Sequence, residues 1–247
     1  AMGSQTHSAP PPPINEPILD YAPGSPERAD LTTELVRQSS EVVEIPLIIG
    51  GKEIRTAETF DVTMPHAHNH VLAHCHVGTE VEAQAAITAS AEAWRDWSEW
   101  SLEERVAILL RASALLEDSW RTKLNAATML GQSKTSFQAE VDAACELIDF
   151  WRFNSHFANK VHAHQPISSP GMWNRIDHRP LEGFIYAISP FNFTAIGGNL
   201  TTSAALMGNV VIWKPSTTGV LASYYVMKLL EEAGMPPGVI NFIPGKA

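Results

Sequence analysis

Four polar side chains follow two short apolar runs in the C-terminal third of the chain. Ser189 and Asn192 come after the first run, and Lys214 and Ser216 come after the second. A side-chain amide such as that of Asn192 can donate hydrogen bonds to an oxyanion that develops during a reaction. A Lys cation next to a hydroxyl group suits a phosphate or a ribose. The sequence therefore indicates two adjacent chemistries, oxyanion stabilisation and nucleotide binding.

The apolar runs themselves predict the elements that position these side chains. Residues 184–188 form a run stopped by Ser189 and Pro190, which predicts a buried strand ending in a turn. A small-residue stretch follows, and then a second run at 210–213 stopped by Pro215. Strand, helix, strand is a βαβ unit, and parallel sheets bind ligands beyond the carboxyl ends of their strands. For Asn192 the alternative interpretation is a turn residue that bonds its own backbone. For Lys214 it is a solvated lysine that follows a buried strand.

The pattern continues toward the C-terminus. A helix is expected at about 218–233 and a strand at 239–243, so residues 182–247 predict a βαβαβ unit. That unit is half of a doubly wound α/β sheet of the Rossmann type. The chain has no GxGxxG fingerprint, so a dinucleotide would not sit on the standard phosphate loop.

The region upstream is predicted to be mixed. Residues 1–24 are expected to be a cloning scar (1–4) and a Pro-rich arm, and residues 25–247 the N-terminal part of a nucleotide-binding domain. Capping boxes begin at Thr79 and Ser101, and a long helix with one apolar face is expected after Ser133. The expected elements are a helix at 25–39, a hairpin at 45–56, strands at 60–64, 71–77 and 173–179, helices at 80–97, 102–119 and 120–131, and a protruding hairpin near 166–182.

Composition limits the function. The 17 basic and 27 acidic residues give a net charge of −10, which disfavours nucleic acid as a partner. No apolar run approaches the ~20 residues of a membrane span. Two cysteines cannot build a disulfide framework. The histidines between 66 and 76 lack the fixed spacing of a metal site, and an exposed strand is the preferred interpretation.

Several segments resemble the aldehyde dehydrogenase superfamily. They are Ser189-Pro-Phe-Asn-Phe-Thr194, Gly197-Gly-Asn-Leu200 and Ala205-Leu-Met-Gly-Asn-Val-Val-Ile-Trp-Lys-Pro-Ser216. Five upstream segments are similar to the branch that oxidises glutamate-γ-semialdehyde, namely Asn15-Glu-Pro17, Gly24-Ser-Pro-Glu-Arg28, Met129-Leu-Gly-Gln-Ser-Lys134, Gln138-Ala-Glu-Val-Asp142 and Glu146-Leu-Ile-Asp-Phe-Trp-Arg-Phe-Asn154. The resemblance implies NAD as cofactor, a small aldehyde as substrate and a homo-oligomer. It implies the cytoplasm in a bacterium and the mitochondrial matrix in a eukaryote.

The resemblance also implies roles for single residues. Asn192 would stabilise the oxyanion, and Phe193 and Glu140 would contact the substrate. The implied cofactor contacts are Ser189, Pro190, Phe191, Lys214, Ser216 and Gly245. The alternative interpretation of Glu140 and Asp142 is a solvated helix face.

The catalytic nucleophile is the feature that the sequence does not supply. Aldehyde oxidation in this superfamily needs a thiolate and a carboxylate base. Neither Cys75 nor Cys145 lies in a segment that resembles the nucleophile segment. We therefore expect the N-terminal half of a longer enzyme, with the catalytic domain absent and the chain alone inactive. The alternatives are a dehydrogenase for another aldehyde and an inactive fragment that acts as a binding module.

Overall fold

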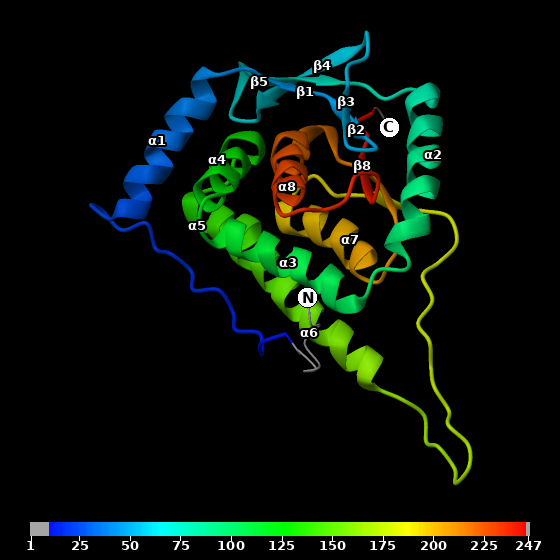
Figure 1. Cartoon of the computed structure of the whole chain (residues 1–247). Helices are drawn as coiled ribbons and strands as arrows, with labels where there is room; N and C mark the ends of the chain where they lie inside the picture. The colour runs from blue at the N-terminus through cyan, green and yellow to red at the C-terminus, as the bar shows by residue number, and fades with distance from the viewer. Residues whose placement is uncertain (1–9, 246–247) are drawn as a thin grey trace, which may run out of the picture.

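The computed structural model describes residues 10–245, so the expected cloning scar at 1–4 lies outside the described residues. The strands form two sheets, and the smaller one, with the order β1-β5-β4, lies along the outer edge of the body in Figure 1. The helical elements are α1 (Pro26–Ser40), α2 (Glu80–Trp97), α3 (Leu102–Glu117), α4 (Arg121–Gln132), α5 (Ser136–Ala139), η1 (Glu140–Cys145), α6 (Glu146–Ala163), α7 (Thr194–Leu206), η2 (Thr217–Gly219) and α8 (Val220–Glu232). The strands are β1 (Val43–Ile45), β2 (Leu47–Ile49), β3 (Lys52–Ile54), β4 (Thr59–Met64), β5 (Ala67–His76), β6 (Ile185–Ile188), β7 (Val211–Lys214) and β8 (Ile240–Phe242).

The larger sheet has the strand order β3-β2-β8-β7-β6. Strands β6, β7 and β8 run parallel, and the pairing of Ile188 with Lys214 brings their carboxyl ends to one edge. This confirms the α/β class and the βαβαβ unit. The hairpin of β2 and β3 joins the same sheet through Ile48 and Phe242, which the sequence pattern did not show.

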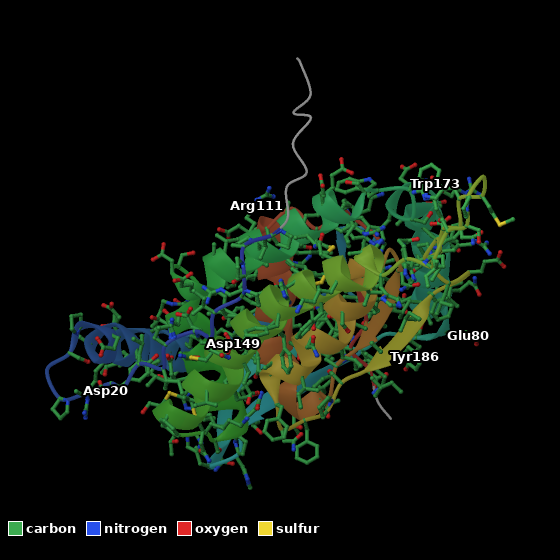
Figure 2. The ribbon with its side chains drawn as sticks, turned by 90° about the horizontal axis from the view of Figure 1, so that it is seen from below. Asp20, Glu80, Arg111, Asp149, Trp173 and Tyr186 are labelled. Carbon is green, nitrogen blue, oxygen red and sulfur yellow. The ribbon has the colours of Figure 1, made fainter. Side chains whose placement is uncertain are left out.

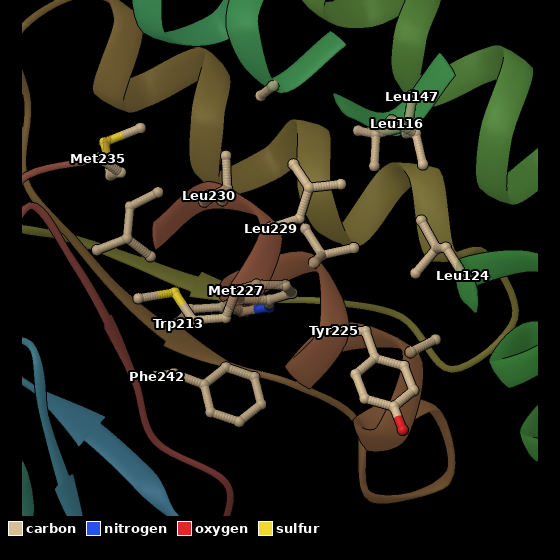
Figure 3. Packing of buried hydrophobic residues seen from close by; sticks show 14 of the residues in the cluster. Leu116, Leu124, Leu147, Trp213, Tyr225, Met227, Leu229, Leu230, Met235 and Phe242 are labelled. Atoms are coloured by element: carbon tan, nitrogen blue, oxygen red, sulfur yellow. The ribbon is translucent and has the colours of Figure 1, made fainter. Parts of the chain in front are cut away.

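Helices cover both faces of this sheet. Along β7, Ile212 packs in a cluster with Ala86 of α2, whereas Val211 and Trp213 belong to the main core on the side of α7 and α8. Alternate side chains of a strand point to opposite faces, so a strand buried on both sides reads as one apolar run. Figure 3 shows Trp213 and Phe242 beneath the side chains of α8, with their ring centroids 5.3 Å apart.

Strand β6 differs from the prediction. It lies at the edge of the sheet, and Tyr186 and Ile188 are 54% and 59% exposed. The expectation of a buried strand is therefore wrong for one of its faces. An apolar run cannot distinguish a central strand from an edge strand whose outer face lacks a cover.

The long helix after Ser133 is not continuous. It consists of α5, the π-turn η1 and α6. A π-turn adds one residue and rotates the following face by ~100°. As a result, Phe137 is 62% exposed while Ile148 and Trp151 are buried, so the predicted single apolar face is wrong at its first position.

The segment after α6 forms a long extended loop that projects from the body and returns to β6 (Figure 1). Residues 164–184 contain no strand, so the strand expected at 173–179 is wrong. Gln165 and Ile176 join the two limbs of the loop, and Asn174 bonds Ile167 and Ser168 near its tip. These contacts replace the regular ladder that a β-hairpin would have.

Candidate active site

Asn192 lies on the loop between β6 and α7. Its side chain is exposed, as are those of Phe191 and Phe193 on either side. Among residues 10–245, no group forms a hydrogen bond with its side-chain amide. The amide can therefore donate to a ligand without first breaking a bond inside the protein.

The loop is held from below by Asp142, which lies in η1. The backbone amides of Thr194 and Ala195 donate to its carboxylate at 3.2 and 3.3 Å. These amides belong to the first turn of α7, whose N-cap residue Phe193 supplies no side-chain bond. Asp142 thus satisfies two amides that would otherwise lack a partner and complements the positive end of the helix dipole.

Lys134 connects Asp142 to the loop. Its ammonium donates to the Asp142 carboxylate and to the backbone carbonyl of Asn192, and it lies 4.7 Å from the centroid of the Phe193 ring. Gln132 donates to the hydroxyl of Thr194 at 2.8 Å. The sequence reasoning gave Lys134 and Gln132 no role, although the segment that contains them was one of the signals of the resemblance.

A cavity of about 530 Å³ lies over the face of the larger sheet toward α2, and it reaches the carboxyl ends of β7 and β8 at Lys214 and Gly245. Lys214 and Gly245, two of the predicted cofactor contacts, line this cavity, and their contact with a cofactor stays a prediction. Lys214 is half-buried, and no carboxylate of residues 10–245 pairs with it. The other lining residues are Gly78, Thr79, Ala83, Ile87, Phe184, Tyr186, Ile212 and Ile243. The cavity therefore combines mostly apolar walls with the cation of Lys214.

Close packing against the end of β8 explains the glycine at position 78, which precedes α2. A Cβ at Gly78 would lie 2.5 Å from Cγ2 of Ile243, and the Gly78 amide donates to the Pro244 carbonyl at 2.8 Å. Any larger residue at this position would push the end of β8 away from α2.

The two predicted serines lie apart from the cavity lining. Ser189 is 4% exposed, and its hydroxyl accepts a hydrogen bond from the Trp213 indole at 2.9 Å. The hydroxyl of Ser216 bonds that of Thr218 at 3.1 Å. Pro190 is exposed on the loop beside Phe191. The structure thus brings Lys214 and Gly245 together in the cavity and places Pro190, Phe191, Asn192 and Phe193 together on the neighbouring loop.

The structure places Glu140 in the interior of the protein. It is 0% exposed and accepts hydrogen bonds from Arg121, the Tyr21 hydroxyl, Asn125 and the Leu19 amide. Burial alone would raise the pKa of Glu140, but the bonds from Arg121, Tyr21 and Leu19 outweigh it and hold that pKa below the ordinary value. The solvated-face interpretation is therefore wrong for Glu140 and for Asp142. Contact of Glu140 with a substrate stays a prediction, which a fully bonded carboxylate does not favour.

Neither cysteine is poised for attack. Cys75 and Cys145 are buried, and the pKa of each thiol is raised to about 12. Burial is the cause for Cys75, and burial together with the neighbouring Glu140 carboxylate is the cause for Cys145. A thiol with such a pKa is protonated at neutral pH and is a poor nucleophile.

Four of the five histidines between 66 and 76 form hydrogen bonds with ordinary partners. His66 bonds Ser133, His74 bonds Asp61, and His76 bonds Glu44. Residues 10–245 contain no group of three potential metal ligands.

No helix in this described part of the chain is long and apolar enough to cross a bilayer.

The fold and the site define the class of protein. The model of the aldehyde dehydrogenase family matches residues 53–247, and the chain belongs to this family. It is 50% identical over 239 residues to the Delta-1-pyrroline-5-carboxylate dehydrogenase of Agaricus bisporus, covering 96% of the chain and 44% of the relative. It is 45% identical over 235 residues to the Delta-1-pyrroline-5-carboxylate dehydrogenase of Emericella nidulans, whose name includes the word mitochondrial. That match covers 94% of this chain and 41% of the relative.

Solved structures of such enzymes share the fold. The Delta-pyrroline-5-carboxylate dehydrogenase of Mycobacterium tuberculosis bound with NAD superposes with a TM-score of 0.97 at 53% identity, covering 98% of this chain and 46% of that one. A mutant form of the Thermus thermophilus 1-pyrroline-5-carboxylate dehydrogenase superposes with a TM-score of 0.88 at 33% identity. The match covers 95% of this chain and 45% of that one. The chain spans less than half the length of each of these proteins.

Proposed function

We propose that this chain supplies the cofactor-binding surface and the oxyanion donor for the NAD-dependent oxidation of glutamate-γ-semialdehyde to glutamate, a step of proline catabolism. The observation that carries the proposal is the amide of Asn192 on a braced loop, next to the strand end that bears Lys214. The names of the relatives and of the NAD-bound neighbour support the choice of substrate and cofactor.

The residues around the cavity fit a dinucleotide. Ile87, Ile212 and Ile243 offer apolar walls to a flat heterocycle, and Lys214 offers a charge to a ribose or phosphate. When bound, NAD+ would supply the oxidising power of the reaction. The protein's part is to hold the adenosine side at this cavity, with Gly245 allowing close approach of the backbone.

Asn192 would act where negative charge develops. Attack on the aldehyde turns its carbonyl oxygen into an oxyanion, and a preorganised amide donor lowers the energy of that state. The attacking thiolate and the carboxylate base are proposed to come from outside these 247 residues. The burial of Cys75 and Cys145 supports this part of the proposal.

Binding of NAD+ to the 247-residue chain tests the cofactor assignment. Titration followed by tryptophan fluorescence should saturate, and Lys214→Met should weaken binding roughly tenfold because one charge-assisted contact is lost. Lys52→Met is the matched control, since Lys52 is exposed on β3. An absence of saturable binding, or an equal loss in both variants, would contradict the assignment.

A turnover measurement tests the proposal that the nucleophile and the base come from outside this chain. The 247-residue chain, checked by intact mass, should form no NADH from pyrroline-5-carboxylate and NAD+. NADH formation at that mass would overturn the assignment of an outside nucleophile, and Cys145 and Cys75 would be substituted next.

The substrate is tested in a fusion of the chain to the C-terminal part of the Agaricus bisporus relative. The fusion should use pyrroline-5-carboxylate in preference to propanal, and Asn192→Ala should reduce its kcat roughly 100-fold or more. A preference for propanal would favour the alternative of a dehydrogenase for another aldehyde. Binding of NAD+ without turnover in the fusion would favour a non-catalytic binding module.

Assembly and location belong to the same proposal. The projecting loop exposes Ile167, Trp173 and Leu181, with Trp173 near its far end (Figure 2), and it would help to form a homo-oligomer. The compartment would be the cytoplasm in a bacterium and the mitochondrial matrix in a eukaryote.

A further inference from the structure

Two sequence segments that the proposed chemistry does not use meet beneath the Asn192 loop. One ends in Lys134 and the other in Asp142, and their side chains form an ion pair. The side chains of Lys134 and Asp142 are 15% and 6% exposed. A pair so nearly desolvated needs additional hydrogen bonds to be stable, and each partner has them.

These additional bonds all go to the loop that carries Asn192 or to the helix that follows it. Asp142 accepts from the amides of Thr194 and Ala195, and Lys134 donates to the carbonyl of Asn192. The loop is also anchored at its other end, where Ser189 accepts from Trp213. Between these anchors, the Lys134 ammonium holds the peptide of Asn192 itself.

We propose that Lys134 and Asp142 are positioning residues that orient the side-chain amide of Asn192. This inference rests on the proposed function insofar as Asn192 is the oxyanion donor. A donor contributes to catalysis only if it is held in place before charge develops, within about 0.5 Å of the productive geometry. Fixing the carbonyl of Asn192 fixes the plane of its peptide and limits the directions open to its side chain.

Asp142 reaches the loop from the side of η1 that faces α7. Asp142 lies in η1 two residues after Glu140, which Arg121 and the Tyr21 hydroxyl hold from the opposite side. Residues two apart on a helix point to nearly opposite sides of it. One short segment therefore presents Glu140 to the N-terminal arm and Asp142 to the start of α7.

Hydrogen exchange of the 247-residue chain tests the positioning without relying on turnover. Lys134→Met should accelerate exchange of the amides between 191 and 197 roughly tenfold, since local opening no longer breaks an ion pair. Lys134→Arg should restore exchange to within about threefold of the original chain, because it keeps the charge and the donors. Lys228→Met is the matched control, since Lys228 pairs with Glu231 and Glu53 away from this loop, and it should leave these amides unchanged.

The outcomes separate this inference from the proposed function. Exchange in Lys134→Met within about twofold of the original chain would overturn the inference, whatever Asn192 does. If Lys134→Met does not unfold cooperatively, Lys134→Gln, which keeps one amide donor, is measured in its place under the same criterion.

A kinetic measurement completes the test in the active fusion. Lys134→Met should lower kcat while leaving the KM for NAD+ unchanged, and it should have no further effect in the Asn192→Ala background. Equal losses in both backgrounds would mean that Lys134 acts only on stability, which would overturn the inference. Unchanged kcat in Asn192→Ala alone would instead refute the oxyanion role in the proposed function.

Discussion

Arg121 and Glu140 form an ion pair inside the protein, with side chains that are 8% and 0% exposed. The same guanidinium donates to Glu16 at 2.6 Å and to the Pro17 carbonyl at 2.8 Å. The Tyr21 hydroxyl donates to Glu140 at 2.6 Å. The extended arm before α1 is therefore attached to the helical core through one charged cluster, with Figure 1 showing its course along the helices.

The first prediction concerns this cluster. Glu140→Gln should reduce the free energy of unfolding by about 3–5 kcal/mol, because it leaves Arg121 buried with its charge less compensated. Urea unfolding at pH 7, followed by tryptophan fluorescence, measures the change. Glu182→Gln is the matched control, since Glu182 forms an exposed pair with Arg179 and should change stability by less than about 1 kcal/mol. Equal, small effects in both variants would show that the buried pair adds nothing.

The second prediction is the direction of the pH dependence. The bonds of Glu140 hold its folded-state pKa below the unfolded value of about 4.3. A carboxyl with a depressed pKa contributes stability that is present above its unfolded pKa and is lost as pH falls through its folded pKa. The original chain should lose stability below about pH 5, and Glu140→Gln should lose less over the same range. Parallel pH profiles for the two proteins would exclude Glu140 as a source of acid lability.

Local signals in the sequence were enough for most of the elements. The capping boxes at Thr79 and Ser101 are both formed, and α2 and α3 begin at the next residue in each case. Strands β7 and β8 have the predicted order and parallel pairing. In these segments the hydrophobic period, the caps and the Gly and Pro positions all favour one structure.

The features that the sequence did not reveal depend on distant partners. Glu140 is buried because Tyr21 and Arg121, 119 and 19 residues away, satisfy its oxygens. The hydrogen bond from the Trp213 indole to the Ser189 hydroxyl also joins two elements, β7 and the end of β6. No local sequence pattern encodes this bond. Tertiary contacts of this kind decide whether a polar residue is a ligand contact or a structural bond, so the candidate site could be predicted only as a region.

The third prediction separates these two roles for Ser189. Ser189→Ala should cost about 1–3 kcal/mol of stability, because the buried Trp213 indole would lose its acceptor. NAD+ affinity should change little, since the side chain does not line the cavity. Ser119→Ala is the control, because its exposed hydroxyl bonds only the Leu115 carbonyl, and it should leave both stability and NAD+ affinity unchanged. A large loss of NAD+ affinity without loss of stability in Ser189→Ala would instead make its hydroxyl a cofactor contact.

The last prediction follows from the edge of the larger sheet. Within residues 10–245, strand β6 pairs with β7 alone, and Tyr186 and Ile188 on it are exposed, with Tyr186 standing at the rim in Figure 2. An apolar edge with unpaired backbone groups favours pairing with another chain. Light scattering of the 247-residue chain should show association that grows with concentration, and Ile188→Lys should reduce it by adding a charge at the edge. Val81→Lys adds the same charge on the exposed face of α2 and should associate like the original chain. A monodisperse monomer at every concentration would show that this edge is protected without a partner, and it would remove the physical reason for expecting another element to cover β6.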